Sequence, residues 1–141
     1  MISRRLFAAV ALLAAFTPLA HGAEGDSRTT QRRITSSEAY VPTASLSAAI
    51  TRDYRFAGLL VVDAGFDIPD PKLRADVVRM QPRITDALRT SLADYTYYRF
   101  HPGGAPDPDK IAFMLQQAAN QVIGRTGAQL LLSNVMVQRG R

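Results

Sequence analysis

The stretch Pro71–Tyr98 constrains the fold of this chain most, because it holds two helical patterns on either side of a proline. Apolar residues recur every three or four positions before Pro82 and again after it, as in helices that bury one face. Asp70 is placed to cap the first helix, with Pro71 at its first position. Because Pro82 lacks a backbone N–H, we expect a helix, a break or kink, and a second helix.

Strand-like sequence flanks these helical patterns on both sides. Residues 40–50 alternate weakly between apolar and polar side chains, and residues 54–67 alternate clearly, with one apolar face. Residues 128–138 are rich in aliphatic and β-branched side chains, and the alternation shifts face near Ser133 and Asn134. We therefore expect a first strand, a long second strand near the middle of a sheet, and a closing strand with a bulge.

A loop rich in proline and glycine occupies residues 101–108, and a further helix follows it. Asp107 is placed to cap this helix, and Gly124 or Gly127 to end it. The predicted fold class is α+β: a small, mostly antiparallel sheet of two N-terminal strands and one C-terminal strand, covered by about three helices.

The composition is that of one globular domain, and it excludes chemistry that requires cysteine. The chain has 141 residues, of which 47% are hydrophobic and 21% are charged, as in ordinary globular proteins. It has no cysteine, which excludes disulfides, thiolate metal sites and cysteine nucleophiles.

The first 23 residues have the pattern of a secretory signal. A basic start with Arg4 and Arg5 precedes an apolar run over residues 6–16 and then small residues. This run is too short to cross a hydrocarbon core of about 30 Å, so we predict cleavage, with an uncleaved anchor as the alternative. The start is similar to a twin-arginine export signal, and the general secretory route stays open.

The predicted location follows from that signal. Residues 24–37 are polar and lack a period, so they form a predicted linker, and residues 38–141 form a single predicted domain. We expect a periplasmic protein, which would be associated with the inner membrane if the signal is retained.

The charge balance argues against a nucleic-acid partner. The net charge of +5 falls to about +3 once the two arginines of the signal are removed, and basic residues are spread thinly through the domain. Arg28, Arg32 and Arg33 cluster near the new N-terminus. They would suit peripheral contact with anionic lipid head groups or with an acidic partner, or they form a solvated tail.

Residues for catalysis, metal binding or cofactor binding are sparse. His101 is the only histidine after the predicted signal, and a lone histidine does not make a metal site. Asp63 and Asp67 lie four residues apart on one predicted strand, about 13 Å, which is too far for a working carboxylate pair. No serine stands in a nucleophile motif. We predict no catalytic residue, no metal and no cofactor.

The polar face and the aromatic end of the central stretch form the predicted partner surface. Its apolar positions are needed for the core, and tyrosine and arginine are favoured in protein interfaces. The candidate residues are Arg79, Arg83, Asp86, Arg89, Tyr97, Tyr98, Arg99 and Phe100. The alternative for the aromatic cluster, which also includes Tyr95, is that alternate members cover the end of the core.

Three motifs occur in order along the domain. Tyr40-Val41-Pro42 opens the first strand, and residues 131–138 close the last strand with a glutamine at the end. Between them the chain reads Leu73-(x)8-Pro82-Arg83-Ile84-Thr85-Asp86-Ala87-Leu88-(x)3-Leu92. Over about residues 40–138 this arrangement resembles the periplasmic domain of the flagellar basal-body-associated FliL family.

The resemblance implies a fold similar to the SPFH domain of stomatin-like proteins. It further implies ring-forming oligomers around the stator units of the flagellar motor, and no catalysis. Two features depart from the family. Its members usually keep a cytoplasmic tail with an uncleaved membrane helix, and they have a plainer connection where this chain has residues 101–108.

Two main hypotheses follow for function. The first is a non-enzymatic exported scaffold or accessory protein of the flagellar basal body, acting through self-association or protein partners. The alternative is a periplasmic small-ligand or partner-binding protein with no motor role, which would use the loop at His101 and the tyrosine cluster. A hydrolase comes third, because it would need a nucleophile and a base that the sequence does not place.

Overall fold

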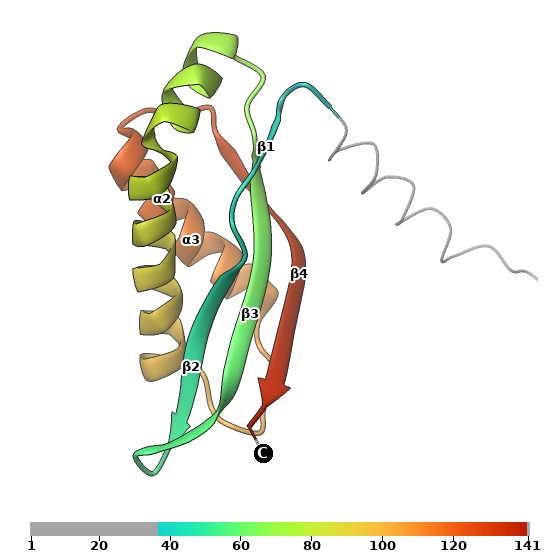
Figure 1. Cartoon of the computed structure of the whole chain (residues 1–141), viewed down its shortest axis with the longest axis vertical. Helices are drawn as coiled ribbons and strands as arrows, with labels where there is room; N and C mark the ends of the chain where they lie inside the picture. The colour runs from blue at the N-terminus through green and yellow to red at the C-terminus, as the bar shows by residue number, and fades with distance from the viewer. Residues whose placement is uncertain (1–36, 141) are drawn as a thin grey trace, which may run out of the picture.

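A computed structural model describes residues 37–140 (Figure 1). The predicted signal peptide and nearly all of the predicted linker lie outside the described residues. The elements in chain order are β1 (Tyr40–Pro42), β2 (Leu46–Arg52), β3 (Arg55–Asp67), α2 (Pro71–Tyr98), α3 (Pro108–Ile123) and β4 (Gln129–Arg139). This confirms the α+β class.

Strand β3 is the centre of an antiparallel, four-stranded sheet. It pairs with β1 at its C-terminal end, with β2 along the rest of the same edge, and with β4 along the opposite edge. The predicted long central strand and the predicted antiparallel closing strand are therefore confirmed. The predicted bulge is confirmed too, because the register with β4 shifts between Asp63 and Ala64, opposite Ser133.

The prediction of one strand over residues 40–50 is wrong, because the structure divides this segment into β1 and β2. Pro42 has no N–H to continue the ladder. Beyond it, the backbone N–H and the Oγ1 of Thr43 both donate to the carbonyl oxygen of Ala64, at 3.1 and 2.9 Å. These two bonds on one acceptor interrupt the regular ladder between the two short strands.

The prediction of a break at Pro82 is also wrong. One helix of 28 residues runs through it, so two helices are described here and not about three. Asp70 caps this helix as expected, accepting from the N–H of Lys72 at 2.9 Å. Pro82 and Val78 are both exposed, so water can bond the Val78 carbonyl that loses its helical donor. The helix bends over the sheet and stays continuous (Figure 1).

We expect Pro82→Ala to raise the free energy of unfolding, by at most about 3 kcal/mol, the difference between proline and alanine inside a helix. The alanine restores one backbone hydrogen bond on an exposed face. The midpoint of urea unfolding at unchanged slope measures this. A lower midpoint would instead show that packing over the sheet depends on the bend.

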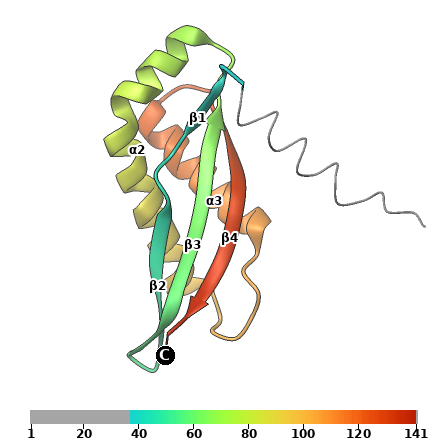
Figure 2. The same cartoon turned by 45° about the vertical axis from the view of Figure 1, so that its right-hand side comes forward.

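Both described helices cover the same face of the sheet (Figures 1 and 2). Their buried side chains meet those of the three longer strands in one core. The largest fully buried side chains are Phe66, Leu46, Leu60, Ile68, Ile84, Leu88, Leu92, Ile111, Leu115, Val62 and Val77. No described helix covers the other face. Neither α2 nor α3 combines the length and the apolar character that crossing a membrane would require.

Candidate partner-binding surface

The polar residues predicted on the central helix point into solvent. Arg79, Arg83, Asp86 and Arg89 are exposed along α2, and together they are called the outer face of α2 below. Their spacing follows from the buried stripe, because the residues opposite a buried stripe on a helix must face outward. This part of the predicted surface is available to a partner.

The aromatic cluster divides between the core and the surface. Tyr97 and Tyr98 are each 74% exposed, and their rings pack edge to face with centroids 4.7 Å apart. Tyr95 and Phe100 are buried, with ring centroids 6.2 Å apart, so Phe100 does not belong to the exposed surface. The Tyr95 hydroxyl accepts from the N–H of Asp107 at 2.9 Å, which ties the end of α2 to the start of α3.

Charges on the outer face of α2 are only partly neutralised. Arg79 pairs with Asp76, which also pairs with Arg125 beyond α3. Within residues 37–140, neither Arg83 nor Arg89 forms an ion pair, and Asp86 pairs with neither of them. The outer face of α2 therefore carries net positive charge.

Asp76 holds the first part of α2 against the turn after α3. Hydrogen bonds from Arg79 and then from Arg125 keep the pKa of its carboxyl below the ordinary 3.8. Since the folded pKa is lowered, the contribution to stability is present above the unfolded pKa and is lost as pH falls through the folded pKa.

We expect Asp76→Asn to lower the melting temperature slightly at pH 7, since exposed ion pairs contribute little. The difference between variant and parent should then shrink as pH falls below about 4. Thermal unfolding followed by circular dichroism between pH 3 and 7 measures this. Asp94→Asn is the control, because Asp94 has no ion pair in the described part of the chain. A constant difference at all pH values would contradict the role of Asp76.

Two other titratable groups are perturbed by contacts that hold the fold. Burial, and then the charge of Asp63, raises the pKa of Tyr40. The backbone N–H and the ammonium of Lys110 lower the pKa of Asp107, which caps α3. These shifts follow from strand packing and helix capping, so they point to no catalytic acid or base.

The acidic and histidine residues do not gather into a site within residues 37–140. No group of three or more metal-ligating side chains occurs there. The carboxylate of Asp63 accepts hydrogen bonds from the hydroxyl of Ser45 at 2.6 Å and from the side-chain amide of Asn134 at 3.2 Å. The second of these bonds holds β3 and β4 together at the bulge. The side chain of His101 is exposed. The Ser45–Asp63 contact is exposed on the sheet, and no histidine hydrogen-bonds to either residue within residues 37–140.

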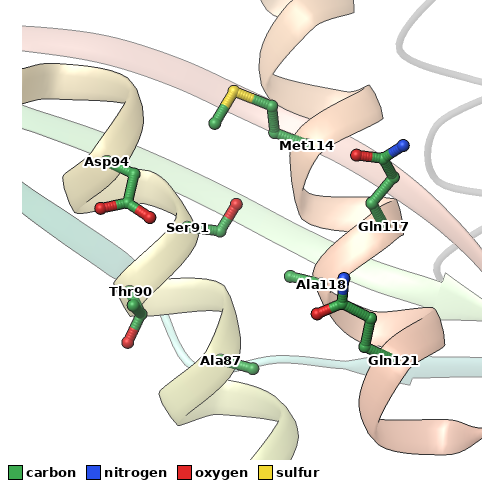
Figure 3. Close-up of a pocket in the computed structure, with 8 residues that line it drawn as sticks. All are labelled: Ala87, Thr90, Ser91, Asp94, Met114, Gln117, Ala118 and Gln121. Carbon is green, nitrogen blue, oxygen red and sulfur yellow. The ribbon is translucent and has the colours of Figure 1, made fainter. Parts of the chain in front are cut away.

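A shallow groove between α2 and α3 was not predicted from the sequence (Figure 3). Its volume is about 330 Å³, and Ser91 and Ala118 face each other across it. The lining residues are Ala87, Thr90, Ser91, Asp94, Met114, Gln117, Ala118 and Gln121. Ala87, Ser91 and Ala118 are half-buried, because their small side chains leave space between the two helices. Most of the side chains that line the groove are polar or small, and Asp94 is the charged residue among them.

A second hollow, called the loop pocket below, lies where the α2–α3 loop meets one end of the sheet. Its volume is about 410 Å³. Apolar side chains of the loop and of the sheet line it, namely Phe100, Pro102, Pro106, Ile50, Val135 and Val137. The ligand-binding hypothesis requires an apolar pocket beside the aromatic segment. Phe100 forms part of this one, whereas Tyr97 and Tyr98 do not line it.

No family model matches the chain, and no curated protein matches it.

Proposed function

We propose that this protein is a non-enzymatic exported scaffold or accessory protein of the flagellar basal body. It acts by binding protein partners, either stator components or further copies of itself. The SPFH-like fold and the ring-forming assembly that the FliL resemblance implies are parts of this proposal.

The exposed pair Tyr97–Tyr98 carries the proposal. Two tyrosine rings, each 74% exposed, lie packed on each other at the end of α2. Tyrosine has few rotatable bonds and a large contact area, so burying such a pair against a partner has a low entropic cost. Arg99 follows the pair and is exposed, and arginine is the other residue type enriched at binding hot spots.

The charge of the same region supports an acidic partner. Arg83, Arg89 and Arg99 have no ion pair within the described part of the chain, so an acidic protein surface complements them. Two such faces would repel each other. Self-association would therefore place the outer face of α2 on a different patch of the neighbouring copy, and such a heterologous contact is the kind that closes rings.

Complementation in the source cell tests the proposal. Deletion of the gene should reduce swimming torque and stator retention, and the parent gene should restore both. A variant with Tyr97→Ser and Tyr98→Ser should fail to restore them, although it folds and accumulates normally. Phe113→Ser is the matched control, since Phe113 is also exposed, at 63%, on the other helix.

Normal torque and stator retention after the deletion would refute the motor role. Equal complementation by the two variants would refute the assignment of the binding surface to Tyr97 and Tyr98.

A further inference from the structure

The loop pocket is lined by apolar side chains and by two arginines. Phe100 and Pro106 line it from the loop, and Ile50 and Val137 line it from the sheet. Arg52 and Arg139 also line it, at the C-terminal ends of β2 and β4. Both strands pair with β3 at this end of the sheet, so the two guanidinium groups belong to the same end of the molecule.

The positive charge of these two arginines is barely compensated. Arg139 has no ion pair among residues 37–140, and Arg52 has one contact, to Asp53 at 3.9 Å. The Arg52 and Asp53 side chains are 71% and 93% exposed, so this contact is weak. Two arginines beside apolar side chains complement a molecule that has an anionic head and an apolar body.

We propose that the loop pocket binds a small amphiphilic carboxylate, such as a medium-chain fatty acid. The carboxylate accepts hydrogen bonds from Arg52 and Arg139, and the alkyl chain lies against Val135, Val137 and Phe100. A pocket of about 410 Å³ is at the small end of the range for ligand sites, about 300–1,000 Å³, which selects a short chain. This site does not depend on the protein-binding function proposed above.

Titration calorimetry of the full mature chain with octanoate tests the proposal. We expect saturable binding of one octanoate per chain. Octanol lacks the charge and should bind at least about tenfold more weakly, because hydrogen bonds to an ionised group are roughly twice as strong as those between neutral groups. Butyrate keeps the charge but lacks most of the apolar body, and it should also bind more weakly.

Variants locate the site. The double change Arg52→Gln with Arg139→Gln should weaken octanoate binding at least about tenfold, and it alters exposed side chains only, so the fold should persist. Arg99→Gln removes an exposed arginine that does not line the pocket, and it should bind like the parent. Methyl signals of Val135 and Val137 should shift on titration. Absence of binding, equal binding of octanol, or equal binding by the double variant would each overturn the proposal.

Discussion

Replacing Leu88 by alanine is expected to lower the free energy of unfolding by about 2–5 kcal/mol. Leu88 has no exposed surface and lies in the middle of α2, in the core between helices and sheet. The truncation removes apolar contact and leaves a cavity that its close-packed neighbours fill only partly. Urea unfolding followed by circular dichroism measures the loss.

Arg89→Ala is the control for Leu88→Ala, because it changes the next residue of the same helix on the exposed face. Its effect should stay within about 0.5 kcal/mol. A loss for Leu88→Ala no larger than this would mean that α2 is not packed on the sheet as described.

Gly58→Ala is expected to destabilise the sheet by about 3 kcal/mol, at the upper end of the usual cost of overpacking. A Cβ on Gly58 would lie 2.3 Å from the carbonyl oxygen of Gln138, which is backbone of the neighbouring strand. Because β3 and β4 are paired at this position, relief of the clash requires their separation. Hydrogen exchange should show lost protection in β4 as well as lower overall stability.

Gly103→Ala is the control for Gly58→Ala, because it introduces backbone strain without a steric clash. Gly103 has φ +99°, but a Cβ there would meet nothing within 4 Å. Gly103→Ala should lower the free energy of unfolding only by the cost of the left-handed backbone, about 1–2 kcal/mol. The hydrogen-exchange protection of the β4 amides should stay unchanged. A Gly58→Ala protein as stable as the Gly103→Ala protein would contradict the close approach of β4 to Gly58.

The fold class was predictable because hydrophobic periodicity reports burial directly. Alternation in residues 54–67 and the helical stripes around Leu73 and Leu88 gave the central strand and the buried faces. The structure confirms the buried face of the strand from Gly58 onward. It contradicts the predicted face at Tyr54 and Phe56, which are exposed at the start of the strand. The effect of Pro82 was not predictable in the same way. Whether a proline breaks a helix depends on the surroundings of the freed carbonyl, and here Val78, which carries it, is exposed. The split of the first strand likewise depends on a tertiary contact, from Thr43 to Ala64.

The candidate sites were predictable in part for a similar reason. Helical spacing predicted that the outer face of α2 would be exposed, and the structure shows this. The aromatic cluster was ambiguous, because the helix ends within it and Phe100 turns back onto the core. The loop pocket could not be predicted, since it brings together residues from β2, the α2–α3 loop and β4. Only the three-dimensional arrangement brings Arg52 and Arg139 to one pocket.

Photo-crosslinking in the source cell tests the central claim most directly. A photoreactive phenylalanine analogue replaces Tyr97 in the full-length chain, and in a matched protein it replaces Ala49, which is exposed on the sheet face that the described helices leave uncovered. The account predicts a discrete adduct from position 97, with a stator protein or a second copy of this chain, and little adduct from position 49. Equal or absent adducts at the two positions would contradict a partner-binding role for the end of α2.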